Sequence, residues 1–225
     1  ANLPRDRRID NMLSITSDGR HAALDIRLVM PETPEPAETK AKAVAARVSQ
    51  IWRETADDRA TQLVFLDLGT PKKAAATDKA TEGEAPPQPD EALTADETRL
   101  RTSIYHDLRQ KLIAAGIPAQ EIAFIHDADS DAKRIHLFRQ MRSGGVRVLI
   151  GSTAKMGEGM NVQDRLVALH HMDVPWKPAE IEQREGRILR PGNRHTEVQI
   201  YRYITQGSFD AYMWTTIERK QLAFG

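Results

Sequence analysis

The sequence predicts an α/β fold in which a mostly parallel sheet carries helices on both faces. Short apolar runs typical of buried strands alternate along the chain with segments of helical periodicity. The chain has 225 residues and no cysteine, so it is long enough to bury a large core without disulfides. This length fits one large domain or two small ones.

The expected elements follow from the apolar spacing between breaks. Five apolar runs predict strands at residues 63–66, 122–125, 146–150, 166–174 and 198–204. Helical spacing predicts helices at residues 38–56, 97–115, 131–142, 178–189 and 208–222. Ligands bind beyond the carboxyl ends of strands in such sheets. The candidate loops therefore follow Leu68, His126, Ile150, Val174 and Ile204.

Two breaks divide the chain. Pro31 to Pro36 separates a lead-in segment, residues 1–36, from the main domain, residues 37–225. Within that domain, residues 70–98 are rich in Ala, Pro, Thr and acidic residues, with Leu93 as the one large apolar side chain. Such a composition cannot bury enough surface to offset the cost of ordering, so we expect an exposed, mobile insertion.

Composition excludes several classes of protein. The absence of cysteine excludes disulfide frameworks, zinc knuckles and thiol catalysis. No apolar run of membrane-spanning length and no signal peptide occurs, and without an initial Met the chain looks like an excised fragment. The 32 basic and 32 acidic residues balance, but residues 142–195 carry a local basic excess. That excess fits phosphate binding or a solvated helix face equally well.

The loop after Ile150 is glycine-rich and runs from Gly151 to Asn161. It lacks the Gly-Lys-Ser/Thr of a phosphate loop and the third glycine of a dinucleotide fingerprint. Its glycines either let backbone N–H groups approach an anion or simply permit a tight turn.

A second candidate is the segment from Gln183 to Asn193. Arg187 and Arg190 are three residues apart, so on a helix both guanidinium groups point the same way. Two such groups match a polyphosphate or a pair of carboxylates. The alternative is internal ion pairing with Glu182 or Glu185.

Four features of residues 133–225 occur together in the order of one family. In chain order they are Arg134 with Phe138; Thr153 through Gly159 with Asn161; Asp173, Trp176 and Pro178; and Gln183, Gly186, Arg187, Arg190 and Gly192. This arrangement resembles the second RecA-like lobe of superfamily 2 helicases, most closely the Swi/Snf-like DNA translocases. Lys177 departs from the usual Asn of that pattern, and Asn193 from the common Gln. The resemblance covers about residues 40–225 without the insertion.

A narrower resemblance lies in longer blocks such as IAFIHDA and EQREGRILR. They are similar to the C-terminal part of large bacterial, phage and plasmid proteins that pair a Swi/Snf-like helicase with an adenine DNA methyltransferase region. The resemblance implies a cytoplasmic protein with a RecA-like, three-layer fold of the P-loop NTPase type.

The resemblance also implies an ATP site between two lobes. A first lobe, which this chain lacks, supplies the phosphate loop and the acidic pair that holds Mg²⁺. This lobe supplies Arg190 as the arginine finger and Arg187 as its companion on the phosphates. Gln183 orients the site, and three residues lie near the nucleotide: Gly157, Gly159 and Asn161.

The resemblance implies that the partner is duplex DNA, which the chain contacts through the phosphates of the DNA backbone. Thr153 donates its hydroxyl hydrogen to a phosphate, a contact that positions the protein on the DNA without reading the base sequence. Lys155 occupies a variable position and is a further phosphate candidate. Glu158 departs from the pattern, because an acid beside a phosphate site is unfavourable unless it is turned away.

Other conspicuous residues have structural explanations. His170 and His171 face opposite sides of an expected strand and are expected to pack rather than bind metal. Trp176 is expected as a packing anchor rather than a base stacker, and Trp52 and Trp214 as core residues. Asp127, Asp129 and Asp131 lack the Gly and Glu of a calcium loop, and Asp131 is expected to cap the next helix.

The sequence thus predicts half of a DNA-dependent ATPase motor, which needs its first lobe, DNA, ATP and Mg²⁺. One rival is a non-catalytic RecA-like module that only docks DNA or a partner. Another, a small-molecule α/β enzyme, lacks a nucleophile, base and orienting residue in one place.

Overall fold

One five-stranded sheet forms the centre of the computed structural model, which describes residues 12–69, 95–157 and 159–224. The strand order is β2-β3-β1-β4-β5, and every pair of neighbours is parallel. The strands are β1 (Thr61–Phe65), β2 (Ile122–Phe124), β3 (Val148–Gly151), β4 (Leu166–His171) and β5 (Gln199–Arg202). The predicted α/β fold with a parallel sheet is therefore confirmed.

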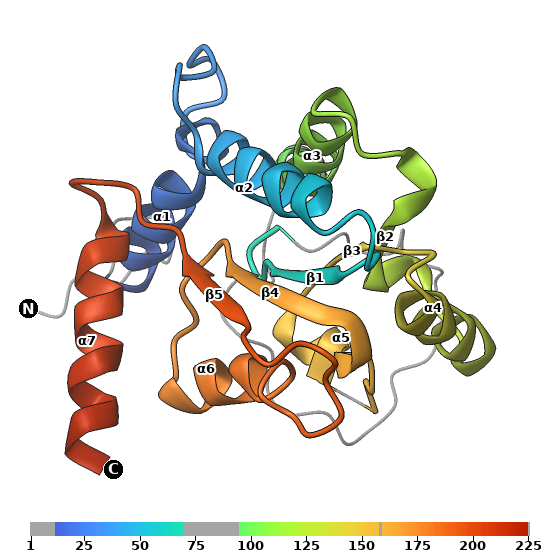
Figure 1. Cartoon of the computed structure of the whole chain (residues 1–225). Helices are drawn as coiled ribbons and strands as arrows, with labels where there is room; N and C mark the ends of the chain where they lie inside the picture. Colours follow the sequence, from blue (N-terminus) through green and yellow to red (C-terminus); the bar gives the residue numbers. More distant parts are fainter. Residues whose placement is uncertain (1–11, 70–94, 158, 225) are drawn as a thin grey trace, which may run out of the picture.

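Helices cover both faces of this sheet, which gives three layers (Figure 1). The helices are α1 (Met12–Leu24), α2 (Lys40–Glu54), α3 (Ala95–Ala114), α4 (Asp131–Ser143), α5 (Thr153–Gly157), α6 (Pro178–Glu185) and α7 (Phe209–Phe224). Helices α2 and α3 lie on one face, and α4, α5 and α6 on the other (Figure 1). Among the described residues, no helix is both long and apolar enough to span a bilayer.

The alternation of side chains along β1 explains how one strand serves two cores. Val64 and Leu66 join the cluster that packs against α2 and α3. Leu63 and Phe65 join the cluster formed with α4 and α5 on the opposite face. All five residues of β1 are buried. Such a strand must be a continuous apolar run, because successive side chains point to opposite faces and both are covered.

Several expected boundaries were wrong. Helix α6 ends at Glu185 rather than near Leu189, because Arg187 and Ile188 donate to the carbonyl groups three residues back and so form a tighter turn. Strand β4 ends at His171 rather than Val174. Ser130, not Asp131, caps α4, and its side chain accepts the Lys133 N–H at 3.3 Å. Terminal residues are where local patterns carry least information.

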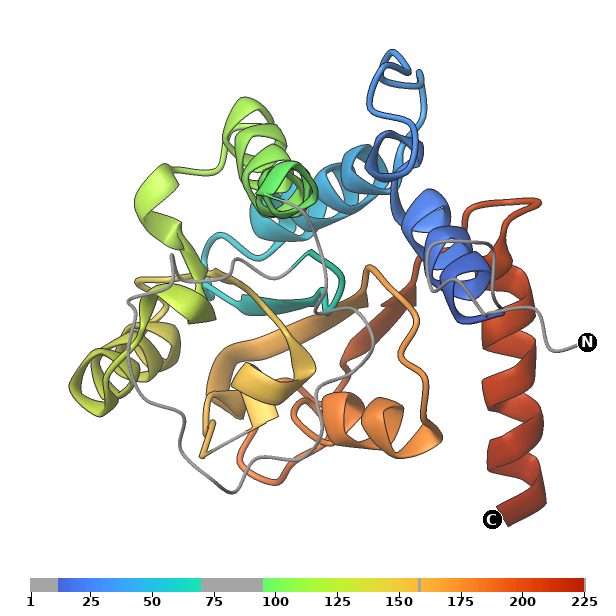
Figure 2. The same cartoon turned by 180° about the vertical axis from the view of Figure 1, so that it is seen from behind.

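Helix α1 was not expected, and it lies beside α7 in both views (Figure 1 and Figure 2). A Cβ atom on Gly19 of α1 would come within 3.3 Å of the Phe209 ring, so the glycine permits this close packing. Ala23 and Leu24 at the end of α1 are buried. Most of the predicted insertion, residues 70–94, lies outside the described residues, but its last residues from Ala95 onward belong to α3.

Candidate functional site

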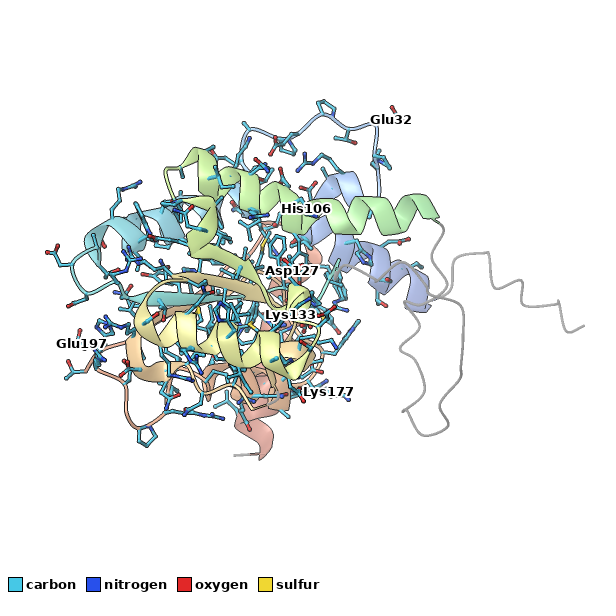
Figure 3. All side chains as sticks on the ribbon, turned by 90° about the vertical axis from the view of Figure 1, so that its right-hand side faces the viewer. Glu32, His106, Asp127, Lys133, Lys177 and Glu197 are labelled. Carbon is cyan, nitrogen blue, oxygen red and sulfur yellow. The ribbon has the colours of Figure 1, made fainter. Side chains whose placement is uncertain are left out.

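The carboxyl ends of the parallel strands meet along one edge of the sheet. In Figure 3, Lys177, which follows β4, lies on the side of the molecule opposite to Glu197, which precedes β5. Two acidic residues stand at this edge, Asp67 after β1 and Asp173 after β4. Asp173 accepts the backbone N–H groups of Asp67 and Leu68 at 2.6 and 2.7 Å, which ties the two strand ends together.

Arg184 of α6 is fully buried between these two carboxylates. Its Nη2 donates to Asp67 Oδ2 at 2.6 Å and to Asp173 Oδ1 at 3.0 Å. Its Nη1 lies 3.1 Å from the Asp173 carbonyl oxygen and 3.3 Å from His171 Nδ1. Its Nε donates to Thr153 Oγ1 at 2.7 Å. A guanidinium carries five N–H donors, so each has an acceptor here.

Asp67 also fixes the start of α5. Its Oδ1 accepts the Thr153 N–H at 2.5 Å, and its Oδ2 accepts the Thr153 hydroxyl at 2.8 Å. Burial opposes ionisation of Asp67, but the Arg184 charge and the Thr153 hydrogen bonds outweigh it and hold the pKa below its ordinary value. Asp67 is therefore an anion with its partners inside the protein.

The predicted nucleotide residues converge on the glycine-rich loop. Arg187 Nη2 donates to the Gly157 carbonyl oxygen, and Arg190 Nη1 donates to that of Met160 at 3.2 Å. Gln183 lies against Gly157, since a Cβ atom there would come within 2.5 Å of the Gln183 amide nitrogen. The structure thus brings Gln183, Arg187, Arg190 and this loop together.

The charges of these two arginines have no carboxylate partner in the described part of the chain. Burial and the neighbouring Arg190 charge lower the pKa of Arg187. The alternative of ion pairing with Glu185 is not realised, because Glu185 binds His171 and Arg202, each at 3.2 Å. Two neighbouring cations without an internal anion form a surface suited to an external one.

Other predicted site residues lie at the margin of this loop. Gly159 has a φ of 59° with open space where a Cβ atom would be, a backbone conformation that favours glycine. Asn161 is exposed, and its carbonyl oxygen accepts Arg142 Nη1 at 2.9 Å. Lys155 is exposed on α5. Glu158 lies outside the described residues.

Thr153 is placed differently from the expectation of a DNA contact. The residue is only 6% exposed, and its one hydroxyl hydrogen goes to Asp67 while its oxygen accepts from Arg184. In this structure the hydroxyl therefore acts inside the protein. A phosphate contact at Thr153 stays a prediction, and it requires the hydroxyl to leave Asp67.

The two histidines of β4 face opposite layers, as the strand period predicts. His170 contacts Tyr203 Oη at 2.8 Å and Gln62 Oε1 at 3.0 Å, while His171 contacts Glu185 and Arg184. Because Gln62 Oε1 only accepts, the neutral His170 ring donates from Nε2. No cluster of three metal-binding side chains occurs among the described residues.

His170 should make the protein less stable in acid. Burial, with smaller effects from His171 and Arg47, lowers the pKa of His170 to about 3. The pKa of an unfolded histidine is about 6.5, so below that pH the unfolded state binds one more proton than the folded state. The free energy of unfolding should then fall by about 1.4 kcal/mol per pH unit as the pH drops from ~6.5 toward 3.

Urea denaturation from pH 7 to pH 5 measures this slope. The variant His170→Gln should be less stable at pH 7 but should show a flatter dependence on pH. The exposed His136→Gln is the matched control and should keep the wild-type slope. An unchanged slope in His170→Gln would contradict the assignment.

The tryptophans pack as expected, with one qualification. Trp214 is buried and Trp52 packs against the core while donating its Nε1 hydrogen to Glu121 Oε2 at 2.7 Å. Trp176 is 40% exposed, and the Arg20 guanidinium lies 4.6 Å from its ring centroid. Trp176 thus anchors α1 to the segment after β4.

Arg184 was missed by the sequence reasoning, which weighed only Arg187 and Arg190 in this segment. A signal did exist. Asp67 and Asp173 each follow a strand whose apolar run predicts burial, and a carboxylate at such a place needs a cation. Which cation it would be cannot be read from spacing, because Arg184 and Asp67 lie 117 positions apart.

Comparisons with known proteins relate parts of the chain to helicases. Residues 95–192 match the family model described as the helicase conserved C-terminal domain. The chain is 40% identical over 62 residues to defense against restriction protein B of Escherichia phage P1, which covers 28% of this chain and 3% of that protein. It is 32% identical over 100 residues to the DNA annealing helicase and endonuclease ZRANB3 of Homo sapiens, which covers 43% of this chain and 9% of that protein.

A third relative is the uncharacterized ATP-dependent helicase YqhH of Bacillus subtilis (strain 168), 36% identical over 80 residues and covering 34% of this chain and 13% of that one. The chain spans only a small part of the length of these relatives. Among solved structures, the C-terminal part of the Fun30 ATPase domain has a TM-score of 0.49 at 14% identity, covering 76% of this chain and 43% of that one. Residues 95–192, which hold most of the site, are therefore similar to the helicase conserved C-terminal domain.

Proposed function

We propose that this chain is the second, RecA-like lobe of an ATP-dependent DNA motor of the Swi/Snf-like type. The observation that carries the proposal is the pair Arg187 and Arg190, which lie without a carboxylate partner in the described structure beside the glycine-rich loop. Gln183 borders the same loop. A first lobe holds Mg²⁺ and the phosphate loop in this proposal.

The chemistry of phosphoryl transfer explains the pair of arginines. Negative charge spreads over the γ-phosphoryl oxygens in the transition state, and positioned guanidinium groups stabilise it. Arg190 acts as the finger and Arg187 as the second phosphate contact. To reach a nucleotide, each guanidinium exchanges a main-chain carbonyl for a phosphate oxygen, a stronger acceptor because it is charged.

In this proposal, duplex DNA binds along the margin of the same edge, at the carboxyl ends of the strands. Lys155 is exposed there, so its ammonium can meet a backbone phosphate. Gly157 at the end of α5 joins this margin to Arg187, which donates to its carbonyl oxygen. The phage relative supports a place in a large phage, plasmid or bacterial protein, and a methyltransferase region in that protein is part of the proposal.

Turnover measurements test this function. Alone, the 225-residue chain should hydrolyse ATP no faster than background, because half of the site is elsewhere. Joined to its first lobe, it should hydrolyse ATP faster when duplex DNA is added. Turnover by the isolated chain that Arg190→Ala abolishes would overturn the two-lobe assignment.

The rival is a module that binds DNA or a partner without catalysis. It predicts DNA binding by the complete protein with no DNA-dependent change in ATP turnover. The same measurements therefore separate the two functions.

A further inference from the structure

We propose that Arg184 is a positioning residue of the ATPase site, and that it holds helix α5 and the turn at residues 186–190 in one fixed arrangement. The inference rests on the proposed function and deepens it. Arg184 does not reach the surface, since it is fully buried, and so it acts through its neighbours.

Arg184 has a complete set of hydrogen-bond partners. All five N–H donors of Arg184 find acceptors on four residues: Asp67, Thr153, His171 and Asp173. These residues follow or end three different elements, β1, β3 and β4. A planar fork with five acceptors at fixed positions has one orientation, whereas a lysine has three donors on one atom and cannot reproduce it.

A closed ring of contacts runs from Arg184 through two of the predicted site residues, Gly157 and Arg187. Arg184 binds Thr153, the first residue of α5. Helix α5 ends at Gly157, whose carbonyl oxygen accepts from Arg187. The Arg187 N–H in turn donates to the Arg184 carbonyl oxygen at 3.1 Å, which closes the ring. A shift of Arg184 therefore moves both ends of the arrangement that holds Arg187.

A second buried arginine lies at the opposite edge of the sheet. Arg147, which precedes β3, is 2% exposed. It donates to the carbonyl oxygens of Ala60, Trp52 and Thr55 at 2.8–3.0 Å. These contacts join the end of α2 to the start of β1, away from the predicted nucleotide residues. Arg147 thus serves as a matched buried arginine with only a role in the fold.

A double-mutant cycle on the complete motor tests the proposal. ATP turnover is measured for Arg184→Lys, Arg190→Ala and the double variant. Because Arg184 acts through the turn at residues 186–190, we expect Arg184→Lys to lower kcat at least 10-fold alone but less than 3-fold in the Arg190→Ala background. Nucleotide affinity, measured by equilibrium binding, should change less than 3-fold. The control Arg147→Lys should act on stability and leave kcat within 2-fold.

Equal effects of Arg184→Lys in both backgrounds, or no effect in either, would overturn the positioning role. If Arg190→Ala itself leaves turnover unchanged, the proposed function fails instead. Hydrogen exchange on the 225-residue chain then decides the positioning role independently. Asp67→Asn, which removes one charge that holds Arg184, should speed exchange of the amides at 186–190 at least 5-fold, whereas Arg147→Lys should not. Unchanged exchange there would reject the ring of contacts.

Discussion

Replacing Arg190 by alanine in the proposed two-lobe motor should lower kcat for ATP hydrolysis by about 10³–10⁵, the range that arginine fingers contribute in GTPases. In the proposed site, the guanidinium stabilises charge that develops only in the transition state. ATP binding should therefore change much less than turnover. Arg187→Ala should lower both ATP affinity and turnover, since we expect Arg187 to contact the phosphates in the bound nucleotide and in the transition state.

Arg194 supplies the control for this variant. It lies four residues beyond Arg190, it is exposed, and it pairs with Asp164 at 3.0 Å. Arg194→Ala removes the same charge from the same segment and should leave kcat unchanged. Single-turnover kinetics separate the chemical step from product release. Equal turnover in wild type and Arg190→Ala would remove the finger from the mechanism.

Replacing Arg184 by methionine should lower the free energy of unfolding by about 3–5 kcal/mol, because it leaves the buried Asp173 and the partly buried Asp67 without their cation. Asp173 is 2% exposed and cannot turn toward water without breaking its bonds to the backbone of Asp67 and Leu68. Urea denaturation of the 225-residue chain measures the loss.

The pH dependence of this loss identifies its cause. Without Arg184, burial raises the pKa of Asp67 in the folded variant above the unfolded value, so the folded state binds protons first as the pH falls. The difference in the free energy of unfolding between Arg184→Met and wild type should therefore become smaller from pH 7 to pH 5. The double variant Asp67→Asn with Arg184→Met should recover part of the stability at pH 7. A loss that is independent of pH would indicate a packing defect instead.

Much of the fold could be predicted from the sequence, because periodicity reports burial directly. The run Leu63 to Leu66 is apolar throughout since both faces of β1 are covered, and helix α2 shows its buried side through Val44 and Val48. Helix α5 could not be predicted, because five residues in a glycine-rich segment have no period to read. Helix α1 owes its position to packing against α7, a contact between distant parts of the chain.

In the site, too, local motifs could be predicted from the sequence, whereas contacts between distant residues could not. The grouping of Gln183, Arg187 and Arg190 near Gly157 follows from motifs that are local in sequence, and the geometry supports it. The occupation of the Thr153 hydroxyl could not be anticipated, because Asp67 stands 86 positions earlier. The spacing of residues along the sequence does not indicate which side chains form hydrogen bonds between different strands of a parallel sheet.

The long separations within the Arg184 network also constrain the order of folding. Asp67 meets Thr153 and Arg184 across 86 and 117 positions. Contacts of such high sequence separation are slow to form, because a long loop must close before they stabilise the chain. During synthesis from the amino terminus, Asp67 is made well before its cation. The strand end at Asp67 therefore reaches its final contacts, and the proposed nucleotide-binding edge is completed, only after Arg184 of α6 docks.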